Sequence, residues 1–309
     1  MSLWQALTPK LEDWRESNYK CDNYPAIAEI LRYQRHEDGS SRYLRIPQIE
    51  ALEMYWFIRL VLKTPRLLDL YKLAFDDPQE LASALGVKVD VRYADIGKIL
   101  EDAVNDSHVA KEFNLEHIIE SLQLDYPSYI MALTMGTGKT VLIGSIIASE
   151  FAMSIEYPEA NFMKNALVFA PGTTIIGSLK ELSDVPYAQI LPPRFYKKFL
   201  ANLKITYAQT GSKTIQIDQG GTYHVVVTNT EKIILKKPAR KKNQSTLEFK
   251  TLEEQYKLTE NQRLAAIKSL PNLGIFSDEA QNTYGSKLDE ELKRVRATID
   301  YLHAERNLV

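Results

Sequence analysis

Cysteine is almost absent from this sequence, and its few histidines are scattered. The single Cys21 excludes an internal disulfide framework. The five histidines, at positions 36, 108, 117, 224 and 303, offer no spacing suited to zinc. Neither a disulfide scaffold nor a zinc centre is therefore expected.

Long apolar runs and an excess of one charge are also missing. No run reaches the roughly 18 apolar residues of a membrane span, and the first residues, MSLWQALTPKLEDW, lack the basic-then-apolar layout of a secretion signal. We expect a cytoplasmic protein without membrane contact. The formal net charge of −2 gives no global attraction to nucleic acid, so any phosphate contact needs local patches or backbone amides.

The composition is that of an ordinary globular protein. The 309 residues are 45% hydrophobic and 25% charged, which is enough for one large domain or two modest ones. Up to about residue 128 the apolar spacing is mostly helical, as in PAIAEILRYQ and QIEALEMYWFIRLVL. We therefore expect a mostly helical region at 1–128.

One helix in this region has clear boundaries. Asp77 can cap DPQELASAL, Glu80 can complete a capping box, and Gly86 can end the helix. The following VKVDVRY alternates apolar and charged residues, which predicts a half-buried strand.

From residue 129 the pattern changes to short apolar runs separated by helical stretches. Such runs suit buried parallel strands, and helical stretches at 139–151 and 173–182 follow two of them. The pattern predicts a doubly wound α/β domain at 129–309. The runs are YIMAL at 129–133, ALVFA at 166–170, KITYA at 204–208, HVVVT at 224–228 and LGIFS at 273–277.

A candidate phosphate loop lies between the first of these runs and the helix predicted after it, the context that such a loop requires. It comprises Met135, Gly136, Thr137, Gly138, Lys139 and Thr140. Glycines let backbone amides turn inward and a helix N-terminus adds partial positive charge, so the loop can cradle a phosphate. Lys139 would reach the β- and γ-phosphates of a nucleotide and Thr140 would bind Mg²⁺. Leu133 stands where the general motif has glycine, and a glycine-rich turn before a buried helix is the alternative.

An acidic pair follows the last predicted strand. LGIFS would deliver Asp278 and Glu279 to the edge at which α/β folds bind ligands. Asp278 can hold Mg²⁺ through water, while Glu279 can orient and deprotonate a water that attacks the γ-phosphate. A solvated Asp-Glu pair at a strand end is the alternative.

Four segments, in the right order, resemble motifs of the superfamily 2 helicases and translocases. LTMGTGKT resembles motif I, LVFAPGTTI motif Ia, VVVTNTEKI motif Ib and FSDEAQNTYG motif II. Within the superfamily the chain resembles the DEAD/DEAH-box-like ATPase subunits of type III restriction enzymes. The resemblance covers about residues 129–285 and implies a RecA-like sheet, hydrolysis of ATP with Mg²⁺, and action on nucleic acid, with DNA favoured over RNA. Its catalytic residues would be Lys139, Asp278, Glu279 and Gln281.

The resemblance also implies a nucleic-acid track, because motifs Ia and Ib of the family touch the backbone across the strand ends. Small hydroxyl residues and helix N-terminal amides can contact phosphates without reading sequence. Ordinary capping and turn residues are the alternative. The candidate contacts are Pro171, Gly172, Thr173, Thr228, Asn229 and Thr230.

A fifth segment, Arg45 to Gln48, resembles the Q motif, in which a glutamine amide bonds the adenine edge. Gln48 would be the reader, with Arg45 beside it in the ATP site. Some 90 residues separate Gln48 from Lys139 where most relatives have a short helix, so 57–128 would be a helical insertion. An ordinary helix-surface glutamine is the alternative.

A basic segment, KKPARKKNQSTLEFK at 236–250, predicts an exposed loop that is either simply solvated or in salt-dependent contact with a nucleic-acid strand. Relatives also have a second RecA-like lobe, whose arginine finger is worth about 10³ to 10⁵ in turnover. We expect this sequence to be an N-terminal piece that lacks this lobe and hydrolyses ATP slowly alone. A methyltransferase or specificity subunit would be a further partner.

Two other functions stay open. A phosphate-loop NTPase could act as a regulatory or remodelling switch on a protein partner, without nucleic acid. A catalytically silent binding module would leave the Lys139 site without nucleotide.

Overall fold

The computed structural model describes residues 1–87, 95–116, 118–133, 137–170, 180–207, 223–229, 262–277, 290–305 and 308–309. The chain divides into two compact units. Unit 1 comprises Met1–Ile146 and Tyr187–Pro192, and unit 2 comprises Ile147–Pro186 and Pro193–Val309. The division falls within a single helix, α9 (Lys139–Glu156).

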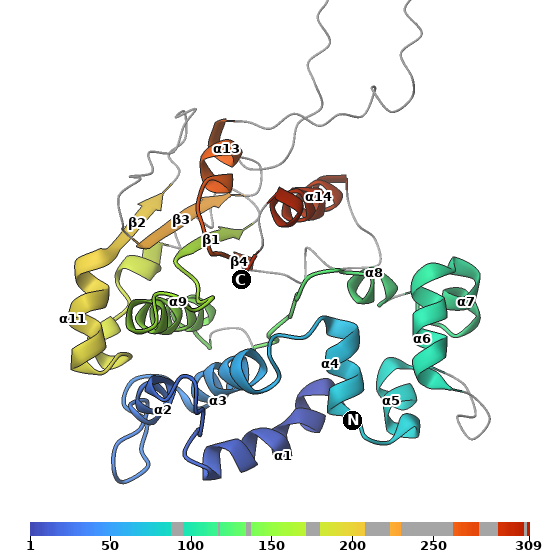
Figure 1. The fold of residues 1–309 in the computed structure, drawn as a ribbon, viewed down its shortest axis with the longest axis horizontal. Coiled ribbons are helices and arrows are strands. Elements are labelled where there is room, and N and C mark those ends of the chain that lie inside the picture. The colour runs from blue at the N-terminus through green and yellow to red at the C-terminus, as the bar shows by residue number, and fades with distance from the viewer. Residues whose placement is uncertain are drawn as a thin grey trace, which may run out of the picture. The chain divides into compact units, whose positions relative to one another are not determined.

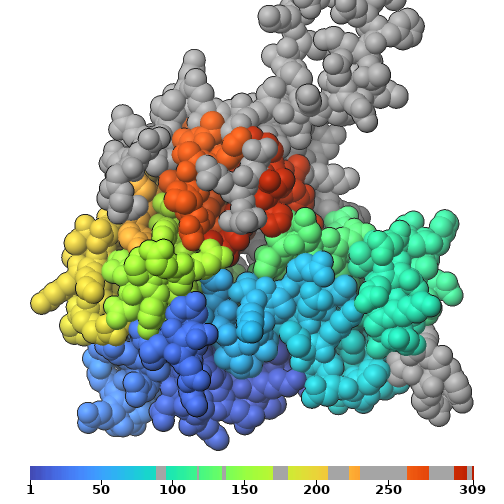
Figure 2. Space-filling model, in the orientation of Figure 1, coloured from blue at the N-terminus to red at the C-terminus, as the bar shows by residue number. Residues whose placement is uncertain are grey.

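The regular elements in the described part of unit 1 are all helical apart from one isolated bridge between Arg35 and Ser41, as the sequence predicts for the residues before 128 (Figure 1). Its α6 and α7 pack against each other, and their surface is seen at the right of Figure 2. The helices are α1 (Leu3–Glu16), α2 (Ala26–Arg32), α3 (Ile46–Trp56), the π-helical turn η1 (Phe57–Val61), α4 (Leu67–Ala74), α5 (Pro78–Leu85), α6 (Ile96–Asn105), α7 (Ser107–Glu112), α8 (Ile119–Leu122), the start of α9, and the 3₁₀ turn η3 (Tyr187–Gln189).

The boundaries of α5 follow from its caps, as the sequence predicts. The Asp77 carboxylate accepts a hydrogen bond from the Gln79 N–H at 2.9 Å, which satisfies one of the free donors at the helix start. Gly86 ends the helix in the left-handed conformation, φ 72°, which glycine adopts without steric cost. The strand predicted in VKVDVRY covers 87–93, and all of it except Val87 lies outside the described residues.

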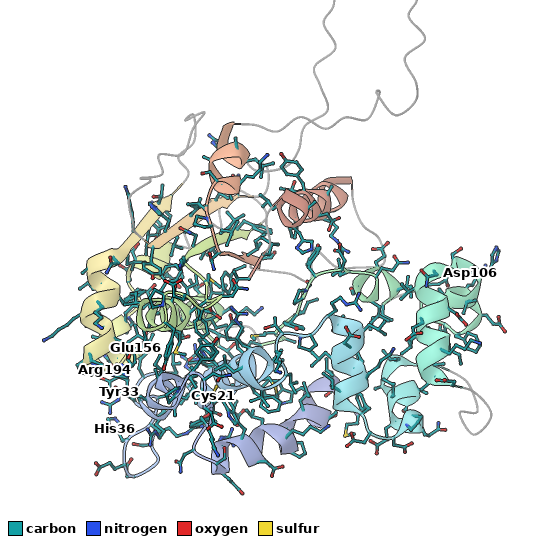
Figure 3. The ribbon with its side chains drawn as sticks, in the orientation of Figure 1. Cys21, Tyr33, His36, Asp106, Glu156 and Arg194 are labelled. Atoms are coloured by element: carbon teal, nitrogen blue, oxygen red, sulfur yellow. The ribbon has the colours of Figure 1, made fainter. Side chains whose placement is uncertain are left out.

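A late segment of the chain completes unit 1. The Gln34 amide is buried and donates a hydrogen bond to the Ile190 carbonyl at 2.8 Å. The Tyr33 hydroxyl, labelled in Figure 3, donates to the Ala188 carbonyl at 3.2 Å. Residues 187–192 thus belong with helix α2, some 155 positions earlier in the sequence.

Unit 2 contains a four-stranded, wholly parallel sheet in the order β2-β3-β1-β4, flanked by helices. Four of the five apolar runs therefore form the predicted parallel strands. The buried β3 places Val225, Val226 and Val227 in the middle of the sheet, since a sheet covered on both faces needs a continuous apolar run. The elements are β1 (Asn165–Ala170), η2 (Lys180–Ser183), α11 (Pro193–Asn202), β2 (Leu203–Tyr207), β3 (Tyr223–Asn229), α13 (Gln262–Lys268), β4 (Leu273–Ser277) and α14 (Glu290–Glu305).

Helix α9 covers one side of this sheet together with α11, while α13 and α14 lie on the other side in Figure 1. The Phe151 ring lies 5.1 Å from the ring of Tyr223 on β3 and 6.4 Å from that of Phe199 on α11. At the end of α9, Glu156 pairs with Arg194 at 2.9 Å (Figure 3). These contacts fix α9 and α11 beside the strands of unit 2.

The prediction of a strand for YIMAL at 129–133 is wrong. These residues form no regular structure, and Ile130 is 56% exposed. A strand needs a neighbour to receive its backbone hydrogen bonds. No described strand pairs with this segment, and the Tyr129 hydroxyl instead donates to the Pro65 carbonyl ahead of α4.

None of the helices in the described ranges combines the length and the apolar character needed to cross a membrane.

Candidate functional site

The described part of the candidate phosphate loop is 137–140 in unit 1, where Thr137 and Gly138 directly precede α9 and Lys139 and Thr140 begin it. Gly138 has φ 76°, in the left-handed region, and its carbonyl accepts the first hydrogen bond of the helix from the Leu142 N–H at 3.1 Å. Lys139 is half-buried and Thr140 is buried. The predicted strand-to-helix setting is thus present only on its helical side, because 129–133 form no strand. Met135 and Gly136 lie outside the described residues.

Gln48 lies against this loop. Its Nε2 donates a hydrogen bond to the Gly138 carbonyl oxygen at 2.9 Å, across 90 residues of sequence. The side chain is only 4% exposed, so it is not the ordinary surface glutamine that the sequence left open. A Cβ atom added to Gly138 would lie 2.7 Å from Gln48 Nε2, closer than real Cβ contacts. The left-handed backbone therefore favours glycine at 138, and a side chain there would displace the Gln48 amide from its hydrogen bond.

The first turn of α3 sets the direction of the Gln48 side chain. Arg45 is the N-cap residue and Pro47 lies in the first turn, where its missing N–H is harmless. Gln48 Oε1 accepts a hydrogen bond from the Arg45 N–H at 2.8 Å, as in the return half of a capping box. Both ends of the amide are thus bonded to backbone, while Arg45 itself is exposed.

Further along α3, Glu53 is completely buried and holds three partners. Arg15 reaches it at 2.6 Å, Arg35 at 2.5 Å and the Tyr19 hydroxyl at 2.7 Å. Burial alone would raise the pKa of Glu53, but the hydrogen bonds from Arg15, Arg35 and Tyr19 hold that pKa below its usual range. The sequence does not mark Glu53 as a site residue. A glutamate in an apolar helical run is the available signal, but its partners cannot be read from spacing.

The two described candidates for nucleic-acid contact lie at the carboxyl end of β3 in unit 2. Thr228 is fully buried and Asn229 is 1% exposed. The Thr228 hydroxyl donates to the Asn229 carbonyl at 3.3 Å. Among the described residues, neither side-chain atom of Asn229 has a hydrogen-bond partner. These side chains do not face solvent as exposed phosphate contacts would, although they do lie at the ligand-binding edge of a parallel sheet.

The remaining candidates lie outside the described residues: Pro171, Gly172, Thr173, Thr230, Asp278, Glu279 and Gln281. The structure does describe Ser277, the last residue of β4, which directly precedes Asp278 in the chain. Strand β4 pairs with β1 over its whole length. In the described ranges, no group of three or more His, Cys, Asp or Glu side chains could hold a metal ion.

Unit 2 defines the class of this chain as an α/β protein with an all-parallel sheet flanked by helices. No protein-family model matches the chain, and no curated protein or solved structure is significantly similar to it. The functional argument therefore rests on the motifs and on the local geometry.

Proposed function

We propose that this chain is an ATP-hydrolysing, RecA-like lobe of a DNA helicase or translocase from a restriction-modification or related defence system. The observation that carries the proposal is the hydrogen bond between Gln48 and Gly138. Two segments that were each assigned to one nucleotide site, 90 residues apart, meet at one glycine. Two unrelated surface features would have no reason to do so.

The residues present fit a nucleotide phosphate. Gly138 has a left-handed backbone conformation at the start of α9, where the first N–H groups of a helix have no acceptor within it and can bond a phosphate. Lys139 would hold the β- and γ-phosphates. Thr140 and Asp278 would hold Mg²⁺, which supplies charge neutralisation when bound.

In the hydrolysis reaction, Glu279 would orient and deprotonate the attacking water, with Gln281 beside it in the same motif. The parallel sheet of unit 2 supports this assignment, because α/β folds bind ligands at the carboxyl ends of their strands. Asp278 and Glu279 directly follow such an end, Ser277 of β4.

The second candidate function is a nucleotide switch that acts on a protein partner without nucleic acid. The burial of Thr228 and Asn229 favours it, since two of the six proposed backbone contacts do not face solvent. The first candidate keeps Pro171, Gly172, Thr173 and Thr230 as its nucleic-acid contacts.

Titration calorimetry with ATP and Mg²⁺ tests nucleotide binding, which both candidate functions require. Lys139→Ala should abolish binding, whereas Lys197→Ala, which removes an exposed lysine of α11, should leave it unchanged. Absence of ATP binding by the wild-type protein, or equal binding by the Lys139 variant, would refute both.

Nucleic acid separates the two candidates. If the chain is a motor lobe, duplex DNA should stimulate ATP turnover, and Thr173→Ala and Thr230→Ala should weaken DNA binding. Unchanged turnover with DNA, together with unchanged DNA affinity of both variants, would favour the protein switch.

A further inference from the structure

We propose that Gln48 is a positioning residue for the phosphate loop, acting on the phosphates of the nucleotide rather than reading its base. This inference rests on the proposed nucleotide site. It differs from the expectation that the Gln48 amide bonds adenine, because that side chain is buried and its amide oxygen and nitrogen each already bond a backbone atom of the protein, at Arg45 and Gly138.

The carbonyl of Gly138 is the point at which Gln48 acts. It accepts two hydrogen bonds, from Gln48 Nε2 at 2.9 Å and from the Leu142 N–H at 3.1 Å. A carbonyl oxygen has two lone pairs, so both are used. The peptide plane between Gly138 and Lys139 is therefore held from α3 as well as from within α9.

That plane determines where the Lys139 N–H points. A peptide unit is planar and trans, so its C=O and N–H point in opposite directions. The Gly138 carbonyl points along α9 toward Leu142, and the Lys139 N–H therefore points out of the helix start. The first N–H groups of a helix have no acceptor within it and, together with the helix dipole, attract anions. Gln48 thus orients a donor that would face phosphate oxygens.

Glycine at 138 makes this support necessary. Its φ of 76° is open to glycine at little cost, but glycine also has more alternative conformations than any other residue. Without a second bond on its carbonyl, the peptide could rotate at the cost of one hydrogen bond. Gln48 adds a bond that such a rotation would also break.

Helix α3 is itself firmly held, so Gln48 has a rigid base. Glu53, five positions further along α3, is buried among Arg15, Arg35 and Tyr19, which come from three other parts of unit 1. The amide of Gln48 is in turn fixed at its other end by the Arg45 N–H. The support therefore runs from the Glu53 cluster through α3 to the start of α9.

The test compares the binding of Mg²⁺–ATP, Mg²⁺–GTP and Mg²⁺–tripolyphosphate by the wild-type protein and by Gln48→Met, which removes both amide bonds at similar size. Loss of a positioning bond should weaken all three ligands by a similar factor, about five- to tenfold for one hydrogen bond. Weakening of ATP alone would show base reading and overturn the inference, as would unchanged affinity for all three.

Gln34→Met is the matched control. Gln34 is a buried glutamine of the same unit that also donates to a distant backbone carbonyl, that of Ile190, but not at the phosphate loop. Its replacement should lower the melting temperature as Gln48→Met does, yet leave tripolyphosphate affinity unchanged. Equal loss of tripolyphosphate affinity in both variants would reduce the Gln48 effect to general destabilisation and overturn the inference.

Gln48→Glu serves as the second variant if Gln48→Met does not fold. It keeps the acceptor for the Arg45 N–H but replaces the donor to Gly138 by a carboxylate oxygen, so tripolyphosphate binding should fall at least as much. Unchanged tripolyphosphate binding by this variant would contradict the inference. If the wild-type protein bound neither ATP nor tripolyphosphate, the proposed function would fail; a binding wild type with indifferent Gln48 variants would overturn only the inference.

Discussion

The Arg15 guanidinium donates two hydrogen bonds to one carboxylate oxygen of Glu53, from Nη2 at 2.6 Å and from Nε at 3.2 Å. The other oxygen accepts from Arg35 and from the Tyr19 hydroxyl. Because Glu53 has no exposed surface, its charge is tolerated only through these donors. The cluster joins the last turn of α1, the loop after α1 and the residues after α2 to the middle of α3.

The Glu53 cluster should contribute measurably to the stability of the protein. Glu53→Ala removes the acceptor of all three partners and should lower the free energy of unfolding by roughly 3 kcal/mol, the low end for breaking a buried pair, because both arginines are partly exposed. Urea unfolding measures it. Glu50→Ala, on the same helix but half-exposed, is the control and should cost much less. Equal losses would show that the buried cluster adds nothing.

The same cluster should make stability depend on acid. Burial raises the pKa of Glu53, yet the bonds from Arg15, Arg35 and Tyr19 outweigh it, so the folded pKa lies below the value in the unfolded chain. A depressed folded pKa gives stability that is complete above the unfolded value of about 4.3 and is lost as pH falls through the folded value. Urea midpoints between pH 7 and pH 3 should therefore fall more steeply in the wild type than in Glu53→Gln. Parallel curves would contradict this.

Gly138→Ala should impair nucleotide binding more than folding. The new Cβ would sit on a left-handed backbone and lie 2.7 Å from Gln48 Nε2, so either the Gln48 amide or the loop must shift and the hydrogen bond between them is disturbed. Strain of about 1–3 kcal/mol is typical of a non-glycine residue in such a position. If relieved by movement of the loop, it should reduce ATP affinity about tenfold or more.

Gly39→Ala separates backbone strain from crowding in that experiment. Gly39 also has a left-handed φ, 83°, but an added Cβ would meet nothing within 4 Å. This variant should lose some thermal stability and keep its ATP affinity, measured by calorimetry. A similar loss of affinity in both variants would mean that general strain, not the contact with Gln48, weakens binding.

Two buried asparagines of the sheet should respond oppositely to leucine. Asn165 donates to the Pro271 carbonyl at 2.6 Å and accepts from the His224 N–H at 3.3 Å, so Asn165→Leu should cost about 1–3 kcal/mol in unfolding free energy. Asn229 has no side-chain partner in the described part of the chain, so Asn229→Leu should be neutral or stabilising. Thermal unfolding compares them. A large loss from Asn229→Leu would show that its amide is bonded in solution.

The sequence predicted those elements whose signals are local. The apolar runs became four parallel strands, and Asp77 and Gly86 bound α5 because capping depends only on residues a few positions away. The start of α9 at Lys139 follows from its glycines in the same way. The strand prediction for YIMAL is wrong because an apolar run indicates only burial. Pairing with a neighbouring strand cannot be read from the run itself.

The contacts of the candidate site were beyond a local reading. Gln48 and Gly138 are 90 residues apart in sequence, so their contact cannot be predicted from spacing. A folded insertion between them can nevertheless bring the two residues together, because the entropic cost of closing a loop rises only slowly with its length. Similarly, the partners of Glu53 come from positions 15, 19 and 35, with no shared period. The burial of Thr228 and Asn229 depends on packing above the strand end, which hydrophobic pattern does not encode.

The late position of residues 187–192 has a consequence for how the protein is made. Gln34 emerges from the ribosome early, but the Ile190 carbonyl that it bonds is synthesised 156 residues later. At about 5–20 residues per second, that interval amounts to roughly ten to thirty seconds of translation. During this time the Gln34 amide nitrogen can make only one of its two hydrogen bonds, to the Ile30 carbonyl of α2, because the Ile190 carbonyl has not yet been synthesised. A ribosome-bound chain stalled before this segment has emerged should accordingly be more sensitive to protease than one stalled after it.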